Sequence, residues 1–109
     1  MSVSSAWALL VLSGLVDVAW AIAIKNADGF RDPLWAGISL VLLAIFVSML
    51  TRALAILPLG AAYAVWVGIG ALGSLVAGVV LFGESFTATR LGFAALIVAG
   101  VIGLKATTT

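Results

Sequence analysis

Four long apolar runs constrain this chain more than any other feature of its sequence. They cover residues 5–24, 34–51, 59–82 and 91–104, and short polar or charged segments separate them. Each run is long enough, or nearly so, to cross about 30 Å of hydrocarbon as a helix. The runs do not alternate apolar and polar residues as the strands of a membrane barrel do. The sequence therefore predicts an all-α membrane protein, with four transmembrane helices in a single domain over residues 1–109.

The composition excludes most soluble functions. Of the 109 residues, 65% are hydrophobic and 8% are charged, which leaves too little polar surface for a soluble domain. The chain has no Cys and no His, so thiolate chemistry and the commonest metal ligand are missing. A secretory signal begins with Lys or Arg before its apolar run, and no Lys or Arg precedes the first run here. We therefore expect that run to be retained as a helix. We expect a multi-pass protein of the cell inner (plasma) membrane that is not an enzyme and binds no metal, cofactor or nucleic acid.

The polar segments carry helix start signals. Asp32 is suited to cap the second helix, and Pro33 to occupy its first turn without losing a needed N–H. Pro58 is expected to open the third helix in the same way, and Ser85 or Thr87 to cap the fourth. Because all three connections are short, neighbouring helices are expected to pack antiparallel.

Asp17 is the only ionisable residue in the first run. Hydrocarbon disfavours a carboxylate by about 2.5 to 3.5 kcal/mol on insertion scales, so acids at this depth usually mark an ion, proton or substrate path. Its face of the helix carries small or amphipathic side chains, which suit a cavity wall: Ser13, Gly14, Trp20 and Ala21. The alternative is a carboxyl group that fixes packing through a hydrogen bond to the backbone or to Ser13.

Tyr63 and Trp66 share one face of the third run, and Gly70 and Ser74 continue that face. Aromatic walls beside a membrane acid suit a cation, because cation–π attraction is worth about 0.5 to 2 kcal/mol and tolerates varied geometry. Tyr and Trp also serve as anchors at the membrane surface, but these two lie one to two turns in from Pro58. We therefore expect both to line the cavity, together with Trp20.

The segment Gly68-Ile69-Gly70-Ala71-Leu72-Gly73 has the G-x-G-x-x-G spacing of dinucleotide-binding loops. No βαβ pattern surrounds it and no acid follows about twenty residues on, so a nucleotide site is not expected. We interpret the glycines as a closely packed or bending segment of a membrane helix.

The distribution of basic residues leaves the orientation nearly balanced. Lys25, Arg31 and Arg90 lie on the side of the first and third connections, and Arg52 and Lys105 lie with the termini. A three-to-two bias is weak under the positive-inside rule, so copies inserted both ways could pair as an antiparallel dimer. A single orientation set by the small excess is the alternative. The fourth run supports association with a small-xxx-small row: Ala95, Ala99 and Gly103.

Over nearly its whole length the chain resembles the small multidrug resistance family of four-helix transporters. The resemblance rests on three segments: Gly14-Leu15-Val16-Asp17-Val18-Ala19-Trp20, the stretch from Pro58 to Gly70, and Gly103-Leu104-Lys105. Gly14 and Trp20 around the acid resemble the guanidinium-exporter branch. The resemblance implies an antiparallel dimer that exchanges protons for a cation through one acid per subunit.

Three positions depart from the family pattern. Asp17 replaces the family's membrane glutamate, and Val67 follows the helix-three Trp where guanidinium exporters usually have Thr. Where those exporters usually have Ser in helix two, counting back from Pro58 gives Phe46, which we expect in the cavity wall. Two hydroxyl donors near the acid are thus lost. These changes also suit one subunit of a heterodimeric transporter whose partner keeps the full site.

Together these features predict a proton-coupled exporter of small organic cations, guanidinium-like ions first and quaternary ammonium compounds second. Asp17 would hold either a proton or the cation, and this exclusion would couple their opposite movements. One alternative is an accessory subunit that forms a heterodimer with a homologous chain instead of a homodimer. The other is a passive cation pore in which Asp17 is the selectivity residue.

Overall fold

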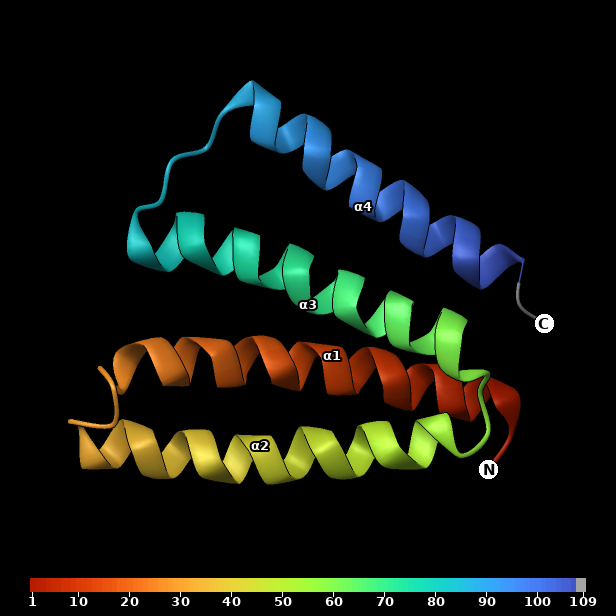
Figure 1. The fold of residues 1–109 in the computed structure, drawn as a ribbon, viewed down its shortest axis with the longest axis horizontal. Helices are drawn as coiled ribbons and strands as arrows, with labels where there is room; N and C mark the ends of the chain where they lie inside the picture. The colour runs from red at the N-terminus through yellow and green to blue at the C-terminus, as the bar shows by residue number, and fades with distance from the viewer. Residues whose placement is uncertain (108–109) are drawn as a thin grey trace.

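The computed structural model describes residues 1–107 as four helices, with successive helices antiparallel (Figure 1). They are α1 Val3–Asn26, α2 Pro33–Leu54, α3 Leu59–Phe82 and α4 Ala88–Ala106. No strand occurs within the described residues. Each helix is long and apolar enough to cross a membrane, which confirms the four transmembrane helices predicted from the sequence.

The residues predicted to start the helices do so as expected, except for Pro58. The Asp32 carboxylate accepts hydrogen bonds from two backbone amides in the first turn of α2, at 3.1 and 3.4 Å, and Pro33 takes the first helical position. Thr87, rather than Ser85, caps α4. Pro58 was expected inside the first turn of α3 but instead precedes it with an extended backbone, ψ 132°. An extended cap residue still directs the chain into the helix, so the start of α3 is unchanged.

The four helices are not packed equally. The backbones of both α2 and α3 approach α1 closely, whereas α3 is the only helix whose backbone α4 approaches closely within the described residues. In Figure 1, α4 lies near α3 toward the C-terminus and diverges from it toward the connection at residues 83–87. The chain is therefore a three-helix unit with a fourth helix attached along one side.

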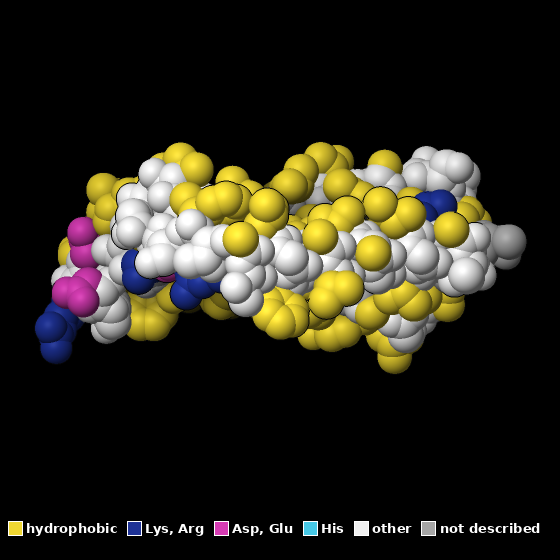
Figure 2. Space-filling view, turned by 90° about the horizontal axis from the view of Figure 1, so that it is seen from above, with side chains coloured by type: hydrophobic (Ala, Val, Ile, Leu, Met, Phe, Trp, Pro, Cys, Tyr) yellow, Lys and Arg dark blue, Asp and Glu magenta, His cyan; other side chains and the backbone are white. Residues whose placement is uncertain are grey.

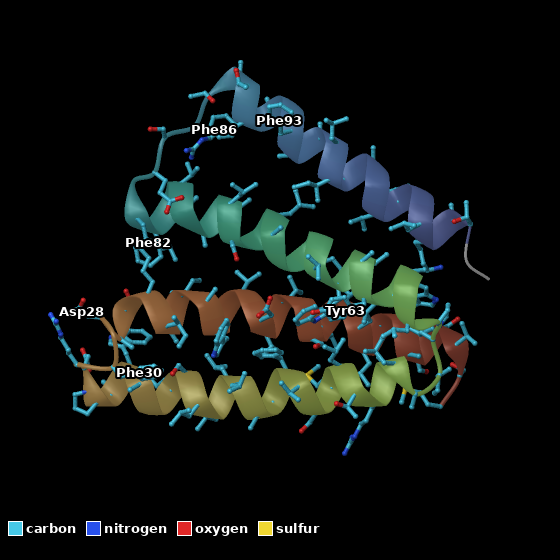
Figure 3. The ribbon with its side chains drawn as sticks, viewed as in Figure 1. Asp28, Phe30, Tyr63, Phe82, Phe86 and Phe93 are labelled. Atoms are coloured by element: carbon cyan, nitrogen blue, oxygen red, sulfur yellow. The ribbon has the colours of Figure 1, made fainter. Side chains whose placement is uncertain are left out.

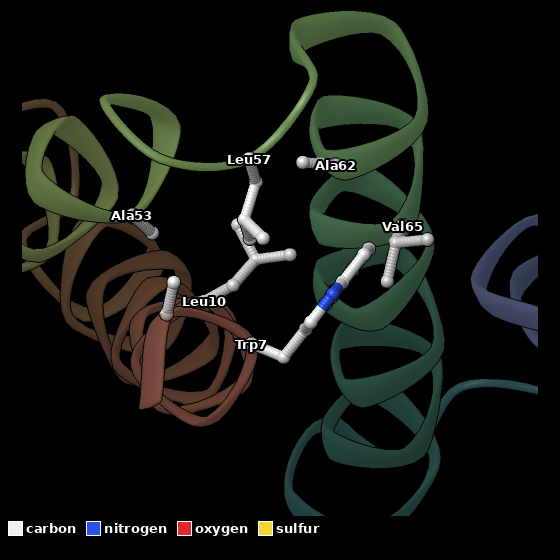
Figure 4. Close-up of a cluster of buried hydrophobic side chains, with 7 residues drawn as sticks. Trp7, Leu10, Ala53, Leu57, Ala62 and Val65 are labelled. Atoms are coloured by element: carbon white, nitrogen blue, oxygen red, sulfur yellow. The ribbon is translucent and has the colours of Figure 1, made fainter. Parts of the chain in front are cut away.

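A buried cluster, drawn in Figure 4, holds this unit together near the start of α1 and the end of α2. It brings α1, the end of α2, the α2–α3 connection and α3 into contact: Ala6, Trp7, Leu10, Ala53, Leu57, Ala62 and Val65. The Lys105 ammonium lies 5.0 Å from the centroid of the Trp7 ring. The end of α4 is thus held near the same cluster.

Charged side chains gather near the two ends of the bundle, and apolar side chains cover its length (Figure 2). Lys25, Arg31 and Arg90 belong to the end with the first and third connections, and Arg52 and Lys105 to the end with the termini. This distribution fits helices that cross a membrane side by side.

Candidate functional site

Asp17 lies near the middle of α1, half-buried against α3. Its carboxylate rests on Gly70, where an added Cβ would lie 2.6 Å from Asp17 Oδ2. Within residues 1–107, no group donates a hydrogen bond to this carboxylate. Packing alone therefore holds it, and its oxygens are available to a ligand.

Ser13 lies one turn before Asp17 and is fully buried. Its hydroxyl donates a hydrogen bond to the backbone carbonyl of Phe46 at 3.0 Å and accepts one from Trp66 Nε1 at 3.1 Å. This chain of bonds joins α1, α2 and α3. The alternative in which Ser13 bonds to Asp17 is therefore wrong, because the hydroxyl proton is already committed to Phe46.

Four aromatic side chains form a row across α1, α2 and α3, about one helical turn from Asp17 on α1 and from Gly70 on α3. The ring centroids of Trp20 and Phe46 are 5.7 Å apart, those of Phe46 and Trp66 5.8 Å, and those of Trp66 and Tyr63 5.6 Å. These separations are typical of aromatic pairs. Gly14 permits the close approach of α1 and α3, because a Cβ there would lie 2.8 Å from Ile69 Cγ2 on α3. The row offers several ring faces to a cation near the carboxylate.

The glycine-rich segment of α3 is a site of close helix packing. Helix α3 runs through it without a break. Gly68 packs against Val101 of α4, and Gly73 packs against Val18 of α1, so a side chain at either glycine would collide with its neighbour. The close-packing interpretation is confirmed. The segment is not a nucleotide-binding loop.

The structure brings most of the predicted residues together but leaves the site open on one side. Contacts link Ser13, Trp20, Phe46 and Trp66, and Gly14 and Asp17 lie on the same face of α1 as Ser13. Phe46 is 6% exposed, whereas Tyr63 at the end of the row is 47% exposed and Val67 45%. Ser74, expected on the same face of α3, lies farther along that helix and lines a pocket away from Asp17.

That pocket was not predicted from the sequence. It lies between the ends of α1 and α3, and its polar and aromatic lining comes from Lys25, Ser74, Phe82 and Glu84. One signal was available, because Lys25 follows Asp17 by eight residues, a little over two helical turns. The sequence gave no such signal for Glu84, because Glu84 reaches the pocket only through the bend in the backbone after α3.

The comparisons with known proteins agree with the four-helix membrane fold. The family model described as Small Multidrug Resistance protein matches residues 5–97. The chain belongs to the small multidrug resistance family. A guanidinium exporter of Yersinia pseudotuberculosis is 48% identical over 100 residues, which cover 92% of this chain and 96% of the relative. A guanidinium exporter of Escherichia coli strain K12 is 44% identical over 102 residues, covering 94% and 97%.

As a small multidrug resistance protein, the chain is a transporter and not an enzyme. Its four membrane-spanning helices make it a multi-pass protein of the inner membrane. The resemblance drawn from Gly14, Asp17 and Trp20 and from the Pro58 to Gly70 stretch is thereby confirmed.

Proposed function

We propose that this chain exports small organic cations, guanidinium-like ions first and quaternary ammonium compounds second, in exchange for protons. Its relatives that are named guanidinium exporters, at 44% and 48% identity, support the substrate class. One observation carries the mechanism: the Asp17 carboxylate lies between α1 and α3 with no hydrogen-bond donor among residues 1–107, about one helical turn along α1 from Trp20 of the aromatic row.

In this mechanism Asp17 binds a proton or a cation, and never both. No protein group donates a hydrogen bond to this carboxylate within residues 1–107, so either a proton or an organic cation can bind to it. The two therefore compete for one group. Trp20, Trp66 and Tyr63 add cation–π attraction, about 0.5 to 2 kcal/mol each. Because occupation by one ion excludes the other, their opposite movements are coupled.

Phe46 supports the inclusion of quaternary ammonium compounds. Its ring occupies the space between Trp20 and Trp66, where the guanidinium-exporter pattern has a small hydroxyl side chain. An apolar wall here favours cations with apolar substituents and provides no side-chain hydrogen bond to a guanidinium N–H.

We further propose that the transporter is an antiparallel dimer. Alone, the chain leaves Asp17 half-buried and Tyr63 exposed at membrane depth. A carboxylate facing lipid is costly, and a second subunit would cover it. On α4, the row of Ala95, Ala99 and Gly103 is exposed, as a helix-pairing surface requires.

A heterodimer is the second candidate. Phe46 and Val67 stand where guanidinium exporters usually carry hydroxyl side chains, so a homologous partner that retains them would complete the site. In that case the purified chain alone would transport little.

The test of coupling is guanidinium-driven proton release by the purified chain in lipid vesicles. We expect the native chain to accumulate guanidinium against its gradient when a proton gradient is applied. Asp17→Asn keeps the shape of the side chain but cannot titrate, so coupled exchange should fall to the background of empty vesicles. Asp28→Asn, a matched change in the exposed first connection, should transport normally. Coupled transport by folded Asp17→Asn would refute the mechanism, and flow only down the gradient would indicate a pore.

The test of antiparallel pairing shifts the balance of basic residues. Ala55→Lys with Thr107→Lys adds charge at the terminus end and should force one orientation, and Asn26→Lys with Thr89→Lys should force the other. Each population alone should lose activity, and co-expression should restore it. A cysteine placed at Ser85 reports orientation cleanly, since the chain has no native Cys. Full activity of a population with one orientation would refute this dimer.

A further inference from the structure

The pocket between the ends of α1 and α3 has the composition of a small cation site. Lys25 on α1 and Ser74 and Phe82 on α3 line it, together with Glu84 just beyond α3. Phe82 lies between the two helix ends in Figure 3. A water molecule takes about 30 Å³ in the liquid, so this cavity of about 160 Å³ has room for a cation of a few heavy atoms.

The backbone fixes the position of Glu84. Gly83 adopts the left-handed conformation, φ 66°, that ends α3, and the Glu84 N–H donates a hydrogen bond to the carbonyl of Gly78 at 3.0 Å. The Glu84 carboxylate then folds back onto α3 and lies directly against Gly78, in space that any side chain at this position would fill. The carboxylate thus lies at the wall of the pocket, where Glu84 stays exposed.

A cation already occupies part of this pocket. The Lys25 ammonium lies 5.2 Å from the centroid of the Phe82 ring, within the range of a cation–π interaction. Within residues 1–107 it forms no ion pair, although Glu84 lines the same pocket. Phe82 therefore already contacts one cation, and Glu84 lines the same pocket without an ion-pair partner among residues 1–107.

The pocket lies on the same helix seam as Asp17. The Asp17 carboxylate meets Gly70, and eight residues farther along each helix Lys25 and Gly78 line the pocket. Because α1 and α3 run in the same direction, eight residues correspond to about 12 Å at 1.5 Å per residue. Between the two places Val18 packs against Gly73 and closes the seam.

We infer that Phe82 and Glu84 form an access site, where a small organic cation binds in place of the Lys25 ammonium before it reaches Asp17. This inference rests on the proposed function, since it concerns the route to Asp17. A guanidinium-like ion displaces Lys25 from the Phe82 ring and gains the Glu84 carboxylate. It then passes to Asp17 when the contact between Val18 and Gly73 separates.

The test compares guanidinium-driven proton release by Glu84→Gln, Lys25→Met and a matched control. Glu84→Gln should raise KM about threefold with little change in kcat, as expected for one exposed carboxylate that acts on binding. Lys25→Met removes the competing ammonium and should lower KM. Asp28→Asn removes the same charge at the same end of the bundle but lies outside the pocket, so its KM should stay native. The effect of Glu84→Gln should shrink in high NaCl.

Equal KM values for Glu84→Gln and Asp28→Asn, whether both native or both raised, would overturn the access site. A second measurement separates this failure from failure of the proposed function. In the Asp17→Asn background, guanidinium chloride is titrated while the backbone amide signals of Lys25, Phe82 and Glu84 are followed by NMR, with NaCl as the salt control. Saturable shifts support the site even if the native chain exchanges no protons. Shifts no larger than those with NaCl overturn it even if the native chain transports.

Discussion

Helices α3 and α4 are both rich in glycine and alanine but use their small residues in opposite ways. Three glycines of α3 face neighbouring helices: Gly68 meets α4, and Gly70 and Gly73 meet α1. On α4, by contrast, no residue is buried, and an added Cβ at Gly103 would meet nothing within 4 Å. Small residues thus build the site within the three-helix unit, whereas on α4 they form a surface without a partner in the single chain.

The sharpest way to break this comparison is to fill the surface of α4. Ala99→Leu combined with Gly103→Leu should prevent close helix approach, so we expect the dimer to dissociate and transport to fall to background. Cross-linking in membranes and proton release in vesicles would measure both effects. Gly60→Leu is the control, since this glycine also faces open space but lies on α3. An unchanged dimer population in the double variant would place the interface elsewhere.

A smaller effect is expected from one methyl group inside the three-helix unit. In Gly70→Ala the new Cβ would lie 2.6 Å from Asp17 Oδ2, so the carboxylate has to move. Overpacking typically costs about 1 to 3 kcal/mol, and we expect guanidinium kcat/KM to fall about tenfold, since 1.4 kcal/mol is a factor of ten. Gly60→Ala adds the same methyl in open space and should behave as native. Native kinetics for Gly70→Ala would show that the contact with α3 does not position Asp17.

An effect of the same order is expected in the aromatic row. Trp66→Leu keeps an apolar side chain but removes the ring face and the hydrogen bond to Ser13. We expect affinity for a phenyl-substituted quaternary ammonium ion to weaken about 2- to 30-fold, from about 0.5 to 2 kcal/mol of cation–π energy. Titration of the purified variant measures the affinity, and thermal unfolding separates it from a folding defect. Trp35→Leu, at the start of α2, is the matched control. Unchanged affinity would place Trp66 outside the site.

Much of the fold followed from local chemistry that can be read along the chain. The four helices follow from apolar length, and the caps Asp32 and Thr87 from side chains that can accept backbone N–H bonds. Helical spacing also brought Ser13, Gly14 and Trp20 onto the Asp17 face.

The contacts between helices could not be predicted in the same way. Ser13 has one hydroxyl with several possible partners, and only the packing of α1 against α2 and α3 selects Phe46 and Trp66. Glu84 was expected only in a loop, because the turn at Gly83, which directs its side chain back onto α3, is a matter of backbone conformation. The guanidinium-exporter pattern pointed to Phe46, but its ring contacts arise only in three dimensions.

The hydrogen bonds of Ser13 have a mechanical consequence. Separating α1 from α2 or α3 breaks a side-chain bond in an apolar medium, whereas separating α4 from α3 breaks mainly side-chain packing. Bonds between membrane helices are worth about 0.6 kcal/mol on average and up to about 2 kcal/mol. The stiff part of the chain is therefore the unit of α1, α2 and α3, and its most compliant joint is the junction of α3 with α4. A force that pulls the helices apart would therefore move α4 away from α3 before it changed the surroundings of Asp17.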